Sequence, residues 1–467
     1  MGDHVKGVPG VVISAPQGRS GKTIASLALS GILTTDGLCV QPFKKGPDYI
    51  DPSWLGAAAK RSCRNLDLFL MPEDVVRAAY SRACRGADVA VVEGAMGLYD
   101  GPEDNGVGST AHLARLLGLP VILVVNTTRM TGSIAAMVGG YQRFQTDIEI
   151  AGVILNNVAG PRHQKKLTEA VERHCGIPVV GSIPRYGEMD MEQRHLGHVP
   201  FGERGGGEAI IAGICERLKP RLDVEHILRI AASAQSPKRM GVEPQEPHPQ
   251  AKAVIGVIRD SAFNFYYIEN LEALERAGAQ LRFIDSLKDR LPEVDGLYIG
   301  GGFPEFFLRE LEANQGLRED IAHAVEKGLP VYAECAGLMY LSRAISWRGE
   351  RREMVGAIPA EVELTDRPQG HGYVELQVVK ANPLFPTGMR LRGHEFHHSR
   401  LVKAEKLEFA YHLNRGHGVE HKADGIIYKN MLAAYTHLHA LGTPEWAPAF
   451  VSLSERARTG GRMIWAS

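Results

Sequence analysis

The sequence has few cysteines, no excess of charge of either sign and no long hydrophobic run. No C-x-x-C pair occurs, and no histidines accompany the cysteines at zinc spacing, which argues against a zinc module. Lysine plus arginine (53) balance aspartate plus glutamate (54), so no global field would attract nucleic acid or an anionic membrane. The longest apolar stretches, such as 120–125, are strand-sized, whereas a bilayer span needs roughly 20 residues. We therefore expect no membrane span, and any anionic ligand must be held by a local site.

The residues that are present indicate a globular protein of two domains. The 467 residues exceed one ordinary core, since domains commonly run to roughly 100–250 residues. A hydrophobic fraction of 44%, a charged fraction of 23% and 52 glycines are typical of a folded chain with many tight turns. The first apolar run, 11–13, is reached without the h-region of a signal peptide, so we expect a cytoplasmic protein.

The first half alternates Val/Ile-rich runs with helical patterns, which predicts an α/β domain with a parallel sheet and helices on both faces. Its expected strands are 11–14, 39–43, 89–92, 121–125, 153–155 and 179–181. A stretch rich in proline and polar residues, 236–251, predicts a linker between a first domain, 1–235, and a second α/β domain, 252–467. In the second domain we expect a helix over 270–277, irregular β structure from about 355 to 435, and strands at 254–258, 281–284, 297–299 and 331–333.

The first strand runs into a loop with the sequence APQGRSGKT (15–23), and a helical pattern follows. A strand, a glycine-bearing loop and a helix N-terminus direct backbone N–H groups and a helix dipole at a phosphate, which indicates an ATP-binding P-loop. We expect Lys22 to neutralise the phosphates and the hydroxyl of Thr23 to bind Mg²⁺. Pro16 stands where the full motif has its first glycine. The other residues of the expected cradle are Gly18, Ser20 and Gly21.

Two acidic segments, KKGPDYIDP (44–52) and VEGAMGLYDG (92–101), follow predicted strands. The carboxyl ends of strands are where open α/β sheets bind ligands. Hard oxygen ligands suit Mg²⁺, so Asp48 and Glu93 are candidate metal ligands together with Thr23. Taken singly, each acidic residue is also typical of a turn or a helix cap. Candidates for guiding an acceptor substrate are Tyr49, Asp51 and Asp100, and candidates for adenine contacts are Asn156 and Asn157.

A cysteine in the second half stands between a predicted strand and an apolar helical pattern, 339–344. A strand-to-helix turn exposes the sulfur of Cys335, and the helix N-terminus favours its thiolate, as a nucleophile requires. The glycine run that follows another strand offers Gly301 and Gly302 to a tetrahedral oxyanion, and His437 offers a base. The segment HEFHH (394–398) contains histidine and glutamate, which are residue types that bind metals. Neighbouring histidines on one strand point to different sides, however, so we do not expect a metal site there.

These motifs resemble the cobyrinate a,c-diamide synthase family. The resemblance extends from about 11 to 439 and is carried by the P-loop, GPDYIDP, NLD (65–67) and VEGAMGLYDG. It implies a dethiobiotin-synthetase-like domain that phosphorylates a carboxylate with ATP, and a class I glutamine amidotransferase domain in which His437 activates the nucleophile Cys335. It further implies ATP- and glutamine-dependent amidation of the a and c acetates of a tetrapyrrole, with cobyrinate as the first acceptor, Mg²⁺ as cofactor, and neither nucleic acid nor membrane as partner.

Several points stay open. Many class I relatives carry Glu two residues after the histidine, whereas this chain has His439, so the partner of His437 is undefined. The cobyrinate enzymes have an apolar residue or a cysteine at the place of Lys45, so siroheme or nickel sirohydrochlorin is an alternative acceptor. A further alternative is a regulatory or metal-insertion P-loop ATPase whose glutaminase-like domain only binds partners. The order of amidation, the route of ammonia and any homo-oligomeric state are also open.

Overall fold

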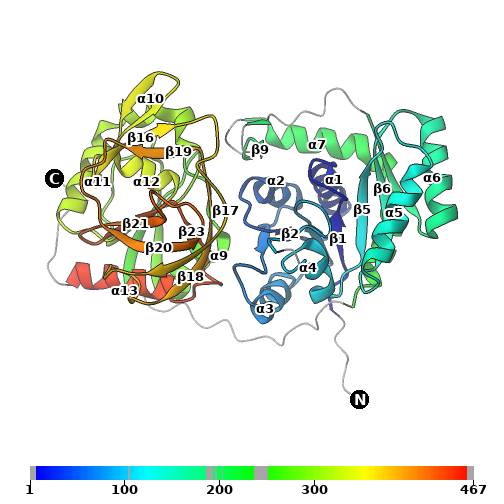
Figure 1. The fold of residues 1–467 in the computed structure, drawn as a ribbon, viewed down its shortest axis with the longest axis horizontal. Coiled ribbons are helices and arrows are strands. Elements are labelled where there is room, and N and C mark those ends of the chain that lie inside the picture. The colour runs from blue at the N-terminus through cyan, green and yellow to red at the C-terminus, as the bar shows by residue number, and fades with distance from the viewer. Residues whose placement is uncertain are drawn as a thin grey trace, which may run out of the picture. The chain divides into compact units, whose positions relative to one another are not determined.

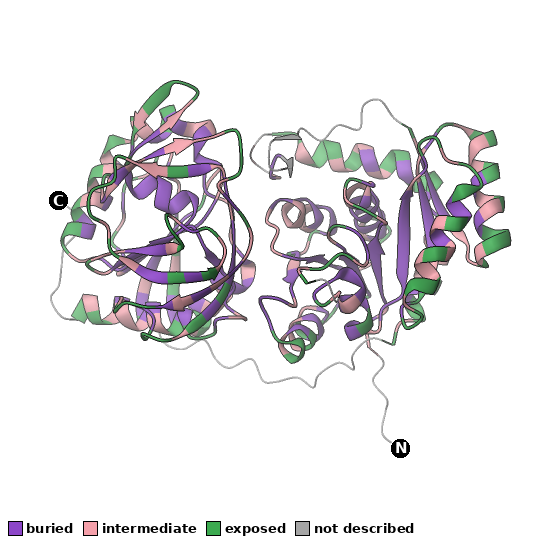
Figure 2. Cartoon of the chain, in the orientation of Figure 1, coloured by how far each residue is buried: buried purple, intermediate pink, exposed green. Residues whose placement is uncertain are grey.

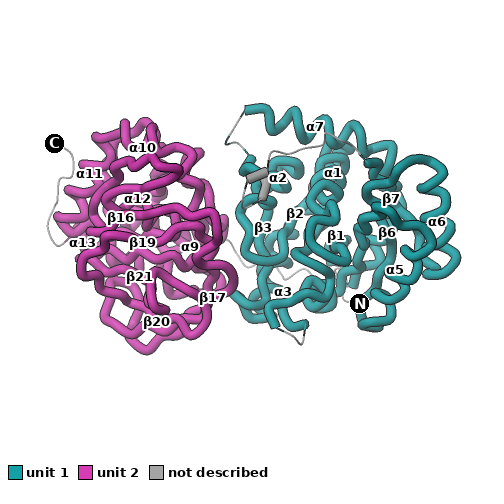
Figure 3. Tube along the Cα trace, turned by 45° about the horizontal axis from the view of Figure 1, so that its top comes forward, with its two compact units in different colours: residues 1–243 teal, residues 244–467 magenta. Residues whose placement is uncertain are grey.

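The computed structural model describes residues 7–103, 106–185, 193–194, 197–201, 203, 205–235 and 251–459. The chain folds as two compact units, 1–243 and 244–467 (Figure 3). Helices and strands alternate in both units, so the predicted α/β class is confirmed. The predicted linker lies outside the described residues except for its last position, 251.

Unit 1 is built on a seven-stranded sheet in which every neighbouring pair of strands is parallel (Figure 1). The strands, in spatial order, are β3 (Arg64–Leu66), β2 (Val40–Lys45), β4 (Val89–Glu93), β1 (Gly10–Ser14), β5 (Val121–Asn126), β6 (Ile150–Val158) and β7 (Val179–Pro184). All except β3 were predicted, because strands buried on both faces need apolar runs. The sequence does not predict β3, since Arg64 and Asn65 leave no apolar pattern in its three residues.

Helices flank both faces of this sheet (Figure 1). They are α1 (Lys22–Thr35), α2 (Ile50–Ala59), α3 (Glu73–Ala83), α4 (Thr110–Leu117), α5 (Ser133–Phe144), α6 (Pro161–Cys175), α7 (Gly207–Leu218) and α8 (Val224–Ala232), with a 3₁₀ turn at Lys219–Arg221 and a small ladder of β8 (Gln193–Arg194) and β9 (Gly197–His198). The strands are buried along their length, whereas the outer surfaces of the helices are exposed (Figure 2).

The parallel arrangement brings the predicted nucleotide motifs to one edge of the sheet. β1 ends at Ser14, β2 at Lys45 and β4 at Glu93, and these three strands are neighbours. Lys44 of β2 pairs in register with Glu93 of β4. The P-loop and both acidic segments therefore leave the sheet side by side at its carboxyl edge.

Unit 2 has a ten-stranded sheet that is parallel in its first half and antiparallel in its second. Its strands, in spatial order, are β11 (Ala279–Ile284), β10 (Ala253–Ile258), β12 (Gly296–Ile299), β13 (Val331–Glu334), β22 (Met431–Ala434), β21 (Ala423–Tyr428), β20 (Phe409–Arg415), β17 (Gly370–Val378), β18 (Arg390–His397) and β23 (His437–Leu438). A second sheet consists of β15 (Glu350–Glu353), β14 (Ser342–Trp347), β16 (Ile358–Leu364) and β19 (Ser399–Val402). The helices are α9 (Ile268–Arg276), α10 (Leu308–Ala313), α11 (Gln315–Glu326), α12 (Ala336–Leu341) and α13 (Trp446–Thr459), with a 3₁₀ turn at Pro304–Phe307.

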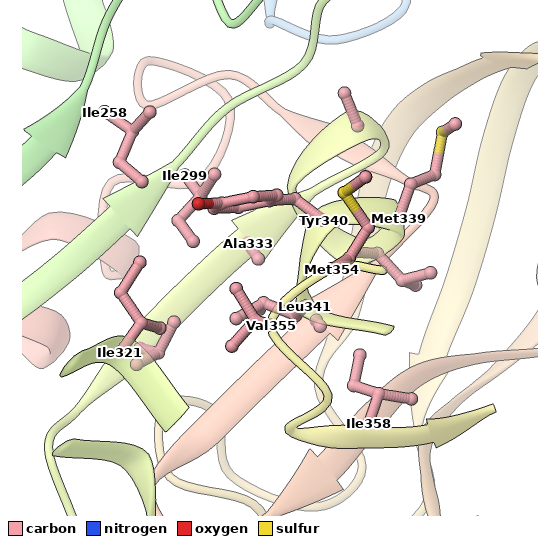
Figure 4. Close-up of a cluster of buried hydrophobic side chains, with 14 of the residues drawn as sticks. Ile258, Ile299, Ile321, Ala333, Met339, Tyr340, Leu341, Met354, Val355 and Ile358 are labelled. Atoms are coloured by element: carbon pink, nitrogen blue, oxygen red, sulfur yellow. The ribbon is translucent and has the colours of Figure 1, made fainter. Parts of the chain in front are cut away.

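The helix predicted over 339–344 is wrong in its second half. α12 ends at Leu341, and the chain continues as β14. β14 pairs with both β15 and β16, so tertiary pairing overrides the helical pattern of this apolar run. The short helix packs in a buried cluster that includes Ile299, Ala333 and Tyr340 (Figure 4), which fixes the turn before it.

Candidate active sites

The loop after β1 has the geometry of a phosphate cradle. Gly21 has a left-handed φ of +95°, and a Cβ atom there would lie 2.2 Å from Nδ2 of Asn156. The same amide donates to the carbonyl of Ser20 at 2.9 Å, so β6 supports the loop. Lys22 begins α1, and its ammonium donates to the carbonyl of Met96 at 2.6 Å. The lysine is therefore held beside the loop, where a phosphate would meet backbone N–H groups and the helix dipole.

A buried ion cluster lies beside Thr23. Its hydroxyl donates to Oε1 of Glu93 at 2.8 Å and lies 3.5 Å from Oδ2 of Asp51. The Lys44 ammonium contacts the same two oxygens, at 2.7 Å for Glu93 and 2.5 Å for Asp51. The second carboxylate oxygen of Glu93 is buried and has no hydrogen-bond partner within the described part of the chain. A buried carboxylate oxygen without a donor suits a cation, so Thr23 and Glu93 fit a Mg²⁺ site.

Asp48 and Asp51 lie differently around this cluster. Oδ1 of Asp48 accepts the N–H groups of Ile50 (2.8 Å) and Asp51 (3.1 Å), and its Oδ2 lies 3.7 Å from the Lys44 ammonium. Asp48 thus stabilises the start of α2, whereas Asp51 reaches the hydroxyl of Thr23. The roles predicted for both carboxylates, metal ligand and acceptor guide, remain predictions.

The other predicted residues of unit 1 are spread around the same edge. Tyr49 is the N-cap residue of α2. Asp100 accepts the N–H of Gly97 at 2.8 Å and so shapes the loop after β4. Gly18 has open space around it in the P-loop. Asn157, a candidate for adenine contacts, donates to Oδ1 of Asn126 at 3.2 Å.

Burial and neighbouring charges shift the pKa values in this cluster. Burial, reinforced by the charge of Asp51, raises the pKa of Asp48 to about 7, and burial also raises the pKa of Glu93. Burial alone would lower the pKa of Lys44, but the surrounding carboxylates hold it well above its usual value. Burial and the charge of Lys44 lower the pKa of Lys22 to about 8. Lys44 therefore stays charged, while Lys22 titrates near the working range of an enzyme.

The turn between β13 and α12 holds Cys335 in an unusual conformation. Its φ is +50°, a strained value for a residue with a side chain, which costs on the order of 1–3 kcal/mol. The N–H of Cys335 donates to the carbonyl of Ala434 at 2.7 Å, which anchors the turn to β22. A Cβ atom at Gly337 would lie 2.4 Å from the carbonyl oxygen of Ile299, so only glycine fits there. Such a strained strand-to-helix turn is the conformation that presents a nucleophile in other hydrolytic enzymes.

His437 lies between the cysteine and a buried carboxylate. Its Nδ1 is 3.4 Å from Oε2 of Glu334, the residue that precedes Cys335. Burial alone would lower the pKa of His437, but hydrogen bonds with Cys335 and Glu334 raise it to about 10. Glu334 also accepts the hydroxyls of Tyr332 (2.9 Å) and Tyr298 (3.1 Å), so its carboxylate is fixed in place. The arrangement favours an imidazolium beside the sulfur.

Three further buried histidines surround this pair. His394 stacks on His437 with ring centroids 4.9 Å apart, and its pKa is lowered well below the usual value by burial and by the charges of His437 and His439. His439, at the position where many class I relatives have Glu, lies 3.7 Å from a carboxylate oxygen of Glu269. His397 stacks on Tyr435 at 3.7 Å.

Of the two predicted oxyanion glycines, Gly301 lies beside the histidine, and Gly302 lies beside Ala262 and Phe263. A Cβ atom at Gly301 would be 2.7 Å from Cε1 of His437, so the backbone touches the ring. Gly302 approaches the backbone of the loop that follows β10. A Cβ atom at Gly302 would be 2.0 Å from the carbonyl oxygen of Ala262. The structure thus brings Gly301, His437 and Cys335 together, while the oxyanion role itself remains a prediction.

The two units match two family models. Residues 11–198 match the CobQ/CobB/MinD/ParA nucleotide binding domain, and residues 254–445 match the CobB/CobQ-like glutamine amidotransferase domain. Together with the phosphate cradle and the Cys–His site, these matches define an ATP-using glutamine amidotransferase.

The chain belongs to the cobyrinate a,c-diamide synthase family. A protein of that name from Magnetococcus marinus is 44% identical over 94% of this chain and 96% of its own length. A protein with the same name from Methanosarcina barkeri is 42% identical over 97% of this chain, and one from Archaeoglobus fulgidus is 40% identical over 95% of this chain. Each match covers 97% of the relative's own length. The chain is therefore an ATP-dependent, glutamine-hydrolysing ligase. Among the described residues, no helix is long and apolar enough to cross a membrane.

Sequence reasoning missed two charged residues of these sites, Lys44 and Glu334. Both are buried, at 4% and 1% exposure, and both stand at or near the end of a buried strand, where Lys44 contacts Glu93 and Glu334 directly precedes Cys335. A charged residue within an apolar strand is the signal that could have found them, since such residues are rarely buried without a partner.

Proposed function

We propose that the chain converts the a and c acetate carboxylates of a tetrapyrrole, cobyrinate in the first place, into carboxamides with ATP and glutamine. The observation that carries the proposal is the presence, in one chain of this family, of a phosphate cradle with an ion cluster and a Cys335–His437–Glu334 site. A carboxylate does not condense with ammonia unaided, because it lacks a leaving group. An ATP site and a glutaminase site therefore complement each other.

In unit 1, a carboxylate oxygen of the acceptor attacks the γ-phosphorus of ATP, and ADP leaves. Lys22 and the N–H groups of the P-loop bind the phosphates, and Lys44 supplies fixed positive charge close to Thr23. Mg²⁺ held by Thr23 and Glu93 would neutralise phosphate charge during this transfer. A cavity of about 370 Å³, lined by Thr131, Ala159, Gly160, Pro161, Arg162, His163 and Lys166, is a proposed place for the nucleotide base.

In unit 2, the sulfur of Cys335 attacks the side-chain amide carbon of glutamine. His437, oriented by Glu334, first holds the proton of the thiol and then gives it to the leaving nitrogen, so ammonia departs and a thioester remains. Water then hydrolyses the thioester to glutamate. N–H groups of Gly301 and Gly302 are the proposed donors to the tetrahedral oxyanion.

The released ammonia attacks the acyl-phosphate, phosphate leaves, and the carboxamide is formed. The nitrogen atom thus comes from glutamine, and the energy comes from ATP. Both reactions on one chain raise the concentration of ammonia available to the acceptor.

The test is mass spectrometry of the products formed from cobyrinate, siroheme and nickel sirohydrochlorin in parallel, with ATP, Mg²⁺ and glutamine. Two amidations of cobyrinate would support the proposal. Two amidations of only siroheme or nickel sirohydrochlorin would keep the reaction and replace the acceptor. Glutamine hydrolysis without amidation of any of the three would contradict a tetrapyrrole acceptor, and ATP hydrolysis without glutaminase activity would favour a regulatory ATPase.

A further inference from the structure

Two buried lysines stand next to each other at the end of β2, and their surroundings differ. Lys44 and Lys45 are only 4% and 5% exposed. The ammonium of Lys44 has three carboxylates within 4 Å. The backbone of Lys45 pairs with Leu66 of β3, but its ammonium makes no hydrogen bond or ion pair with any described residue. Because successive side chains of a strand point to opposite faces, Lys45 points away from the cluster that neutralises Lys44.

A buried cation without a counter-ion is costly, so proteins rarely keep one without a reason. Burial lowers the pKa of Lys45, and the charges of Asp67 and Asp100 only partly oppose this effect. These two carboxylates follow β3 and β4, which places the Lys45 ammonium among the loops at the carboxyl edge of the sheet. It is therefore close to the phosphate cradle without being part of it.

The backbone around Lys45 is fixed. The side chain of Asn65 donates to the carbonyls of Gly46 (2.9 Å) and Asp48 (2.7 Å), and the N–H of Gly46 donates to the carbonyl of Leu66 at 3.0 Å. Gly46 itself has a left-handed φ of +90°. The loop therefore fixes the backbone from which the Lys45 side chain extends, and less conformational entropy is lost when the ammonium binds an anion.

We propose that Lys45 binds a peripheral carboxylate of the acceptor, so that substrate supplies the direct ion pair that no described residue makes with this ammonium. The inference rests on the proposed function, in which the acceptor carries several carboxylates and enters at this edge. The γ-phosphate of ATP is the other anion in reach, but Lys22 already lies beside the P-loop that would bind it.

The experiment compares the wild type with Lys45→Met, which keeps an unbranched side chain of nearly the same length and removes its charge. KM is measured for cobyrinate, siroheme, ATP and glutamine, and cobyrinate and siroheme binding are also measured without ATP. The matched control is Lys165→Met, which removes an exposed lysine, 78% accessible, from α6 of the same unit.

The expected result is a rise of about 10- to 100-fold in KM and Kd for the acceptor, with unchanged KM for ATP and glutamine. The melting temperature of the ligand-free variant should equal or exceed that of the wild type, because an uncompensated buried charge is removed. Lys165→Met should behave as the wild type.

Three results would overturn the inference. These are unchanged acceptor binding in Lys45→Met, a rise in KM for ATP instead, or a lowered melting temperature with parallel loss of all ligands, which would show a structural role. If the wild type itself neither binds nor amidates either tetrapyrrole, the proposed function fails, and the inference fails with it. The first three results leave the proposed function intact, so the two failures are distinguishable.

Discussion

At the scale of single residues, the glutaminase site depends on which carboxylate contacts and orients the imidazole ring of His437. At the position where many class I relatives have Glu, this chain has His439, which lies 3.7 Å from a carboxylate oxygen of Glu269. Glu334 takes the place beside Nδ1 of His437, from a different element of the fold. The chain thus brings a carboxylate to the histidine from the residue that directly precedes the nucleophile.

We predict that Glu334→Gln lowers kcat/KM for glutamine hydrolysis by about 10- to 100-fold, as loss of an orienting partner does elsewhere. Glu334 helps to raise the pKa of His437, so in Glu334→Gln the imidazole should lose its proton at a lower pH than in the wild type. Because the imidazolium activates the neighbouring sulfur, the enhancement by His437 of the rate at which iodoacetamide alkylates Cys335 should disappear at that lower pH. Tyr332→Phe is the control, since it removes a hydrogen bond to the other oxygen, Oε1, and should change both measurements much less. Equal effects of the two substitutions would mean that Glu334 acts only by packing.

A second residue-scale prediction concerns Lys22, whose pKa is lowered to about 8 by burial and by Lys44. Only the protonated amine attracts phosphate, so affinity for ATP should fall as pH rises through about 8. Bound phosphate stabilises the ammonium and raises its pKa, so binding near pH 8 should take up protons. Calorimetry in buffers with different ionisation enthalpies measures this uptake. Proton release, or none, in the wild type with normal ATP binding would contradict the assignment.

At the scale of elements, the P-loop depends on the close approach of β6. We predict that Gly21→Ala abolishes ATP-dependent amidation, because its Cβ would displace the Asn156 amide, 2.2 Å away, from the loop. Gly37→Ala is the control, since Gly37 has a similar φ of +93° but nothing within 4 Å. It should cost only the strain of a left-handed backbone at a residue with a Cβ atom, about 1–2 kcal/mol, and keep activity. Glutaminase activity of both variants should remain, and equal loss of amidation in both would show that strain alone is responsible.

The elements that could be predicted from sequence are those with a strong local pattern. The parallel strands of unit 1 are apolar runs, and the P-loop is defined by its glycines and Lys22. Periodicity could not predict β3, which is short and polar, or the end of α12 at Leu341, which is set by pairing of β14 with β16. Likewise, the contacts of Lys44 and Glu334 arise from strand register, which a single sequence does not reveal.

At the scale of the whole molecule, the two reactions should be separable by substitution. We predict that Cys335→Ser abolishes amidation with glutamine but keeps amidation driven by free ammonia, because the acyl-phosphate still forms in unit 1. Lys22→Ala should remove amidation with either nitrogen donor. Product formation is measured with each donor for both variants. Equal loss with both donors in Cys335→Ser would contradict the division of work between the units.

The central claim is that a carboxylate is phosphorylated and then amidated with glutamine nitrogen. Its most direct test supplies an acceptor whose carboxylates carry a heavy oxygen isotope, together with glutamine labelled with heavy nitrogen in the amide, and follows both labels by mass spectrometry. We predict heavy nitrogen in the carboxamide and heavy oxygen in the inorganic phosphate, because the acyl-phosphate passes an acceptor oxygen to the leaving phosphate. Amide formation with no heavy oxygen in phosphate would contradict the account.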